Sequence, residues 1–116
     1  MNRTIIGTPV GKGWRGFMSE DWGDPTRQGM IIYNKIMEKG IDAYLQEIVD
    51  NSTECKITNN FIYYYFLTKE EMFLYVLDKN ESLLLGYVGW DEPIEVIKSQ
   101  LRVMEKKGLK YERICS

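Results

Sequence analysis

The chain has 116 residues, a length that predicts a single domain over residues 1–116. It carries 15 basic and 17 acidic residues, a net charge of −2, and 44% of its residues are apolar. This composition is typical of a globular domain. It argues against a disordered tail and against a strongly basic nucleic-acid-binding protein.

The chain contains no histidine. Histidine is the usual general base and the commonest transition-metal ligand, so its absence excludes Ser-His-Asp catalysis, Cys-His catalysis and the usual catalytic zinc sites. The two cysteines, Cys55 and Cys115, are too few for a structural zinc site and too far apart for a Cys-x-x-Cys redox motif. We therefore expect no enzymatic activity, no metal and no cofactor.

The chain start does not look like a targeting segment. Residues 1–4 lack the apolar core of a secretory signal, and no apolar run approaches the ~20 residues that a membrane span needs. We therefore expect a cytoplasmic protein, of bacterial or phage origin, with free thiols. A disulfide between Cys55 and Cys115 would require neighbouring strands, which the sequence leaves open.

The N-terminal half predicts a strand and two helices. The expected segments are a strand over residues 3–8, a glycine-rich loop or irregular hairpin over 11–16, and helices over 25–39 and 41–50. Asp24 is suited to cap the first helix, which begins at Pro25. Gly40 is a natural helix end, although the apolar spacing also permits one long helix through it; we favour two helices.

From residue 53 the apolar period changes to two, which predicts strands joined by short polar turns. The expected strands are residues 53–58, 61–67, 72–77 and 82–90, with turns at 59–60, 69–70 and 79–80. A last helix is expected from Pro93 until Gly108, followed by a strand over 110–115. The predicted class is α+β: an antiparallel sheet of about four to five strands around a central meander, with about three helices, in the order β-α-α-β-β-β-β-α-β.

The predicted sheet is apolar on both faces. Two-residue turns give a register with these cross-strand pairs: Phe66 with Phe73, Tyr64 with Tyr75, Leu77 with Ser82, and Tyr75 near Leu84. Both faces then lack the polar alternation of a sheet with one face in water. In the arrangement that we favour, the helix pair covers one face and the last helix the other. In the alternative, all helices cover one face, and the second face meets another protein or a second copy.

Tryptophan stands just before an acidic, proline-bearing helix start at two places, Trp22 and Trp90. Helix starts alone explain nearby acids and a packed tryptophan. The functional interpretation is an acidic, aromatic surface that docks a basic protein, to which tyrosines sharing one sheet face would add. The predicted partner-binding residues are Glu20, Asp21, Trp22, Asp24, Tyr63, Tyr65, Tyr87, Trp90, Asp91 and Glu92.

These features predict a non-catalytic, protein-binding inhibitor, such as an immunity protein against a toxin or a phage antagonist of host defence. Toxin nucleases are often basic, so a mildly acidic domain would occlude them well. The expected partner is another protein of basic character, and neither a membrane nor nucleic acid is expected. The alternative is a small-ligand-binding or regulatory module that forms a homodimer through the second sheet face.

Overall fold

The computed structural model describes residues 3–52, 62–78 and 81–115. The expected strand over residues 53–58 and the turn at 59–60 lie outside these residues, and so does any pairing of Cys55 with Cys115.

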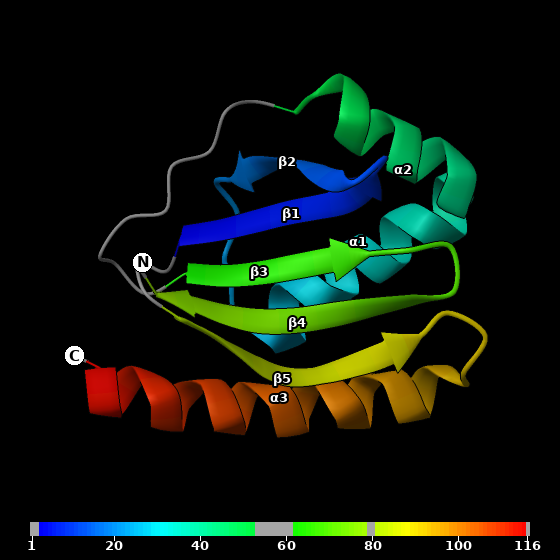
Figure 1. The fold of residues 1–116 in the computed structure, drawn as a ribbon. Helices are drawn as coiled ribbons and strands as arrows, with labels where there is room; N and C mark the ends of the chain where they lie inside the picture. The colour runs from blue at the N-terminus through cyan, green and yellow to red at the C-terminus, as the bar shows by residue number, and fades with distance from the viewer. Residues whose placement is uncertain (1–2, 53–61, 79–80, 116) are drawn as a thin grey trace.

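Five strands and three helices follow one another along the described chain (Figure 1). In chain order they are β1 (Arg3–Val10), β2 (Gly13–Ser19), α1 (Pro25–Lys39), α2 (Ile41–Asp50), β3 (Ile62–Leu67), β4 (Glu71–Asp78), β5 (Glu81–Gly89) and α3 (Ile94–Cys115). The predicted α+β class, with three helices and a sheet of about five strands, is confirmed.

The five strands form one sheet in the order β2-β1-β3-β4-β5. The pairs β1–β2, β3–β4 and β4–β5 are antiparallel. Strands β1 and β3 are parallel instead, because the chain passes through α1 and α2 before it returns beside β1. The sheet is therefore mixed, whereas the sequence predicted antiparallel pairing only.

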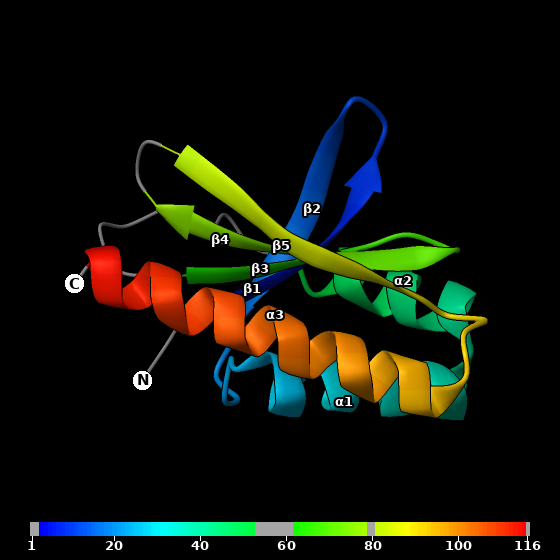
Figure 2. The ribbon, with the colours of Figure 1, turned by 90° about the horizontal axis from the view of Figure 1, so that it is seen from below.

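All three helices lie on one face of the sheet (Figure 2). The main core shows the same arrangement, because it joins residues of each helix to one set of strand residues: Ile32 and Ile36 of α1, Tyr44 and Ile48 of α2, Ile97, Leu101 and Met104 of α3, with Ile6, Tyr63, Tyr65, Leu67, Met72, Leu74, Val76, Leu85 and Val88. The arrangement that we favoured, with the last helix on the opposite face, is therefore wrong. None of the described helices is long and apolar enough to cross a membrane.

Helices α1 and α3 share that face because a glycine lets them approach. A β-carbon on Gly29 of α1 would lie 2.5 Å from Cδ2 of Leu101 in α3. The hydroxyl of Thr26 also donates a hydrogen bond to Oε1 of Glu105, at 2.8 Å, and so ties the start of α1 to α3. Contact with α1 thus holds α3 on the covered side.

The break between α1 and α2 falls at Gly40, which confirms two helices. Its backbone φ is +88°, a conformation that favours glycine. At the other end of α1, Pro25 occupies the first turn as expected. The Asp24 carboxylate makes no capping bond; it lies 3.4 Å from the hydroxyl oxygen of Thr26 and 3.6 Å from Nε of Arg27.

One segment resolves an alternative that the sequence left open, and one differs from the prediction. Of the two alternatives for residues 11–16, the structure shows the hairpin: residues 13–19 form strand β2, which pairs antiparallel with β1, and no loop extends beyond the turn at 11–12. Helix α3 continues to Cys115, so the expected strand over 110–115 is wrong. Gly108 does not end the helix: a β-carbon there would lie 2.7 Å from the hydroxyl oxygen of Tyr63, so this glycine permits close packing on the sheet.

The predicted register of β3, β4 and the start of β5 is confirmed. The structure pairs Phe66 with Phe73, Tyr64 with Tyr75, Leu77 with Ser82, and Tyr75 with Leu84. Beyond Leu84 a β-bulge intervenes: Gly86 pairs with Leu74, and Leu85 has no partner in the register. The extra residue exchanges the faces of Tyr87 and Val88 relative to the prediction.

Candidate functional site

The sheet face opposite the helices, called the open face below, is aromatic and aliphatic. Ile5 and Tyr64 form its centre, and half-buried side chains of Met18, Phe66, Tyr75 and Leu77 pack against them. Cross-strand pairing and ring contacts add the remaining members, which are Trp14, Phe73, Leu84 and Tyr87. This confirms that both faces of the sheet are apolar.

Several open-face side chains are strongly exposed. Trp14 is 42% exposed, Leu84 49% and Tyr87 58%. They stand on the two outer strands, β2 and β5, while the central rings of Tyr64 and Phe66 stack with centroids 5.9 Å apart. A row of aromatic side chains therefore crosses the whole sheet.

Trp14 lies over a pair of glycines. Gly7 and Gly16 face each other across β1 and β2, and a β-carbon on either would meet the indole ring, at 3.2 Å and 2.9 Å respectively. The ring also meets Tyr64 edge-on, with centroids 5.1 Å apart and planes at 83°. These two glycines, called the glycine floor below, thus leave the space in which the Trp14 ring packs against the sheet.

Trp14 also borders a hollow on the open face. The hollow has a volume of about 330 Å³, and its other lining residues are Tyr64, Phe66, Tyr75, Leu77 and Ser82. A volume of this size is at the lower end of small-ligand sites. Apart from the tyrosine and serine hydroxyls, the lining side chains offer apolar and aromatic contacts.

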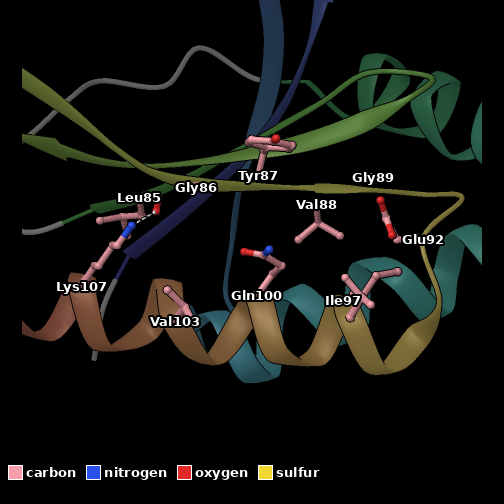
Figure 3. A pocket seen from close by; sticks show the side chains of 11 residues that line it. Leu85, Gly86, Tyr87, Val88, Gly89, Glu92, Ile97, Gln100, Val103 and Lys107 are labelled. Atoms are coloured by element: carbon pink, nitrogen blue, oxygen red, sulfur yellow. Dashed lines mark hydrogen bonds between the residues drawn. The ribbon is translucent and has the colours of Figure 1, made fainter.

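A second depression lies between β5 and α3 (Figure 3). This edge groove has a volume of about 290 Å³ and is lined by residues 85–89 of β5 and by side chains of α3 and its approach. Lys107 and Glu92 mark its two ends, and Val103, Gln100 and Ile97 line the helix side between them (Figure 3). The groove is more polar than the hollow on the open face.

Two of the predicted interface tyrosines are not at the surface. Tyr63 and Tyr65 are buried under the helices, and the Tyr65 hydroxyl donates to the carbonyl oxygen of Gly23 at 2.6 Å. The expectation that Tyr63, Tyr65 and Tyr87 share one face is therefore wrong. The bulge at Leu85 turns Tyr87 to the open face, where its ring lies 6.0 Å from that of Phe73.

The segment around Trp22 connects β2 to α1. Glu20, Asp21 and Trp22 are exposed, and Asp24 is partly buried. The guanidinium carbon of Arg27 lies 5.1 Å from the centroid of the Trp22 ring, a cation–π arrangement. A basic residue of the chain itself thus occupies one face of this tryptophan.

The segment around Trp90 connects β5 to α3. Trp90 is half-buried against the core, and its indole N–H donates to the carbonyl oxygen of Thr68 at 2.9 Å. Asp91 and Glu92 are exposed. Trp90 therefore has a structural role at the start of α3, which leaves the two acids as the accessible part of this segment.

The structure does not bring the two tryptophan segments together. Ser19, before the first segment, pairs with Thr4 at the start of β1, whereas Thr68 follows the far end of β3. The connections from β2 to α1 and from β5 to α3 accordingly lie at opposite ends of the strands (Figures 1 and 2). They form two small acidic sites rather than one surface.

Titratable groups do not gather into a reactive centre among the described residues. No cluster of three histidine, cysteine, aspartate or glutamate side chains that could hold a metal ion occurs there. Burial is the main cause that raises the pKa of Tyr44 to about 12, with smaller effects of Glu47 and Asp21. Burial likewise raises the pKa of Tyr65 well above its usual value. Both tyrosines lie in the core, away from the hollow and the groove.

No protein-family model, curated protein or solved structure matches this chain. The site is therefore interpreted from its own geometry. The sequence prediction included Tyr87 but missed Trp14, Tyr75 and Leu84. The sequence feature that pointed to this site was the apolar pattern on both faces of the strands. It indicated that each face is covered by other residues or by a partner, but not which face lacks a helix.

Proposed function

We propose that this chain is a non-catalytic protein-binding domain and that the open face is its contact surface. One observation carries the proposal: all three helices lie on one side of a sheet that is apolar on both sides. Burying a large apolar side chain is worth about 1.5–3 kcal/mol, so a partner that covers Trp14, Leu84 and Tyr87 gains substantial free energy.

The residue types of the open face support a protein partner. Tryptophan and tyrosine are enriched at the centres of protein interfaces, because they combine a large apolar area with a polar group. On this face Trp14 and Tyr75 both contact Tyr64, and Tyr87 contacts Phe73. Large contiguous apolar patches are uncommon on proteins that act alone.

The finer proposal is an inhibitor, such as an immunity protein against a toxin or a phage antagonist of host defence. It rests on the net charge of −2 and on exposed acids at both ends of the strands, among them Asp21 and Asp91. Such charges would steer a basic partner toward the domain, while the open face would supply the contact area. The partner proposed is therefore a basic protein with an apolar docking patch.

The hollow beside Trp14 supports a second candidate function. Its volume of about 330 Å³ and aromatic lining suit a small apolar ligand, as in a regulatory module. In that case the open face would also allow a homodimer. A dimer mass in solution, or a saturable change in the fluorescence of Trp14 with a small aromatic compound, would favour this candidate.

The test is capture of a partner from the native host with matched variants. The double variant Leu84→Glu/Tyr87→Glu places two charges on the open face, and Met37→Glu places one on the exposed side of α1, where Met37 is 55% exposed. We expect the wild type and Met37→Glu to retain the same partner and the double variant to lose it. Equal retention by all three proteins would refute the proposal, provided that circular dichroism shows each variant folded.

A further inference from the structure

Strand β5 is at the edge of the sheet, so one side of its backbone pairs with no other strand of the described residues. The amide of Trp90 donates to the carbonyl oxygen of Glu70 on the β4 side. Because the backbone N–H and C=O groups of an antiparallel strand point alternately to its two sides, this bond determines which residues of β5 direct these groups toward β4 and which direct them away. Val88 and Gly86 therefore face β4, while Tyr87 and Gly89 direct their N–H and C=O groups away from it. The edge thus offers the N–H groups of Tyr87 and Gly89 and the carbonyl oxygen of Tyr87 at the spacing of a β-ladder, while the Gly89 carbonyl oxygen already accepts from the amide of Glu92 at 3.2 Å.

The edge groove runs along these outward groups. Helix α3 lies beside residues 85–89 of β5 and forms the other wall (Figure 3). Of the side chains between them, those of Val103 and Gln100 are exposed, while Val88 and Ile97 lie buried at the base of the groove. At about 3.4 Å per residue, the stretch from Leu85 to Gly89 matches some five residues of extended chain.

The two ends of the groove carry opposite charges. Lys107 lies beside Leu85, and its ammonium group donates a long, 3.4 Å hydrogen bond to that carbonyl oxygen. Glu92 lies at the other end, beside Gly89. Because an ammonium group has three donors, Lys107 keeps capacity for an incoming acceptor. The groove is therefore polarised along its axis.

We propose that the edge groove binds an extended segment of a partner polypeptide, which pairs antiparallel to β5 as a sixth strand. An antiparallel segment runs from the Glu92 end to the Lys107 end, so its C-terminal side, carrying an acidic residue or a terminal carboxylate, meets Lys107. Alternate side chains would enter the groove toward Val103, and the others would continue the open face beside Tyr87. This inference goes beyond the proposed function and does not depend on the open face being an interface.

A polypeptide fits this groove better than a second copy of the chain. Pairing β5 with β5 would bring the second copy's α3 into the space that α3 already occupies beside the edge (Figure 1). A segment without a helix of its own avoids this conflict. The main-chain groups of Tyr87 and Gly89 supply affinity for any extended backbone, and the end charges supply direction.

The experiment is selection from a displayed library of random seven-residue peptides with free C-termini. Dissociation constants of the selected peptides are then measured for the wild type, Lys107→Glu and Lys106→Glu. Lys106 is a matched control, since it is the adjacent, exposed lysine and does not line the groove. Amide hydrogen exchange of Tyr87 and Gly89 is followed by NMR in the same samples.

We expect selected peptides to share alternating apolar positions and an acid toward the C-terminus. Lys107→Glu should weaken binding about tenfold or more and Lys106→Glu less than about twofold. The amides of Tyr87 and Gly89 should exchange at least about tenfold more slowly with peptide bound. The inference is overturned if no peptide is selected, if both lysine variants bind alike, or if these amides are unaffected. A dimer that Lys107→Glu dissociates would assign the edge to a second copy instead.

Failure of this inference and failure of the proposed function can be told apart. Lys107 belongs to α3 and contributes nothing to the open face, and Leu84 does not line the edge groove. Tyr87 borders both surfaces, so the single variant Leu84→Glu is the one that separates them. A partner that Leu84→Glu loses and Lys107→Glu keeps supports the open face alone. A peptide lost only in Lys107→Glu supports the edge groove alone.

Discussion

The indole ring of Trp14 meets the phenol ring of Tyr64 edge-on, with centroids 5.1 Å apart and planes at 83°. Such pairs add about 0.5–1.5 kcal/mol to simple area burial. The contact joins the outer strand β2 to the central strand β3 across β1, and it depends on the glycine floor below the indole. The most exposed aromatic side chain of β2 is thus fixed in place before any partner binds.

The glycine floor gives the first prediction. In Gly16→Ala the new β-carbon would lie 2.7 Å from the carbonyl oxygen of Ile6 and 2.9 Å from Cζ3 of Trp14. We expect a loss of about 1–3 kcal/mol in the free energy of unfolding, measured in urea, and a changed near-ultraviolet circular dichroism signal. Gly13→Ala is the control, because no atom lies within 4 Å of its β-carbon. Equal stability of the two variants would contradict the packing described for Trp14.

Two buried tyrosine hydroxyls give a second prediction, which a matched pair of variants tests. The Tyr65 hydroxyl donates to the Gly23 carbonyl oxygen, whereas the Tyr44 hydroxyl has no hydrogen-bond partner among the described residues. Tyr65→Phe leaves a buried carbonyl unsatisfied and should cost about 1–3 kcal/mol in unfolding free energy. Tyr44→Phe removes an unpaired polar group and should be neutral or slightly stabilising. The same urea experiment checks both, and the reverse ranking would be evidence against these assignments.

The raised tyrosine pKa values predict a loss of stability in alkali. The unfolded chain releases its tyrosine protons near pH 10, whereas burial raises the pKa of Tyr44 to about 12 and also raises the pKa of Tyr65 well above its usual value. The neutral form is therefore favoured in the folded state, so stability is fully present below pH 10 and falls as the pH rises above it. By pH 11 the raised pKa of Tyr44 alone should lower the free energy of unfolding by roughly 1 kcal/mol.

Unfolding free energies measured between pH 9 and pH 11 test this directly. The wild type should lose stability over that range, and Tyr44→Phe should lose less. A flat profile for the wild type, or parallel profiles for the two proteins, would show that Tyr44 titrates normally in the folded chain.

The acidic segments predict a kinetic effect. Charge reversal at Asp21 and Asp24, or at Asp91 and Glu92, should slow association with a basic partner by a few-fold at low salt and flatten the salt dependence. Because the two segments lie at opposite ends of the strands, the two effects should be independent. Stopped-flow association rates measure them. Unchanged association rates in both double variants would show that these acidic residues do not steer the partner toward the domain.

Local pattern sufficed for much of the fold. The period of two predicted β3, β4 and β5, and short polar turns predicted the pairing of Tyr64 with Tyr75. Gly40 marked the end of α1 in the sequence because glycine commonly ends a helix. The apolar stripes of α1 and α2 are otherwise continuous, and the structure breaks them at this residue, whose φ is +88°. These features depend on residues near one another in the sequence.

The features that the sequence did not predict depend on tertiary contact. Gly108 looked like a helix end, but it lies against Tyr63, and α3 continues past it. Gly86 looked like an ordinary strand residue, but its place beside Met104 accompanies the bulge that exchanges the faces of Tyr87 and Val88. A glycine that ends a helix and one that permits close packing look the same in a single sequence.

The candidate site was predicted in part for the same reason. The apolar pattern showed that both sheet faces need a cover, and Tyr87 was among the predicted residues. Burial of Tyr63 and Tyr65 followed from the positions of the helices, which strand periodicity does not specify. Trp14 was missed because glycines surround it in the sequence, and that pattern left a loop and an irregular hairpin equally open.

The most direct test of the open face as an interface is site-specific photo-crosslinking. A benzophenone amino acid is placed at Tyr87 on the open face or at Met37 on the far side of the helix layer, both of which are exposed. The captured partner should crosslink efficiently from position 87 and not from position 37. Crosslinks from position 37 with none from position 87 would contradict the account.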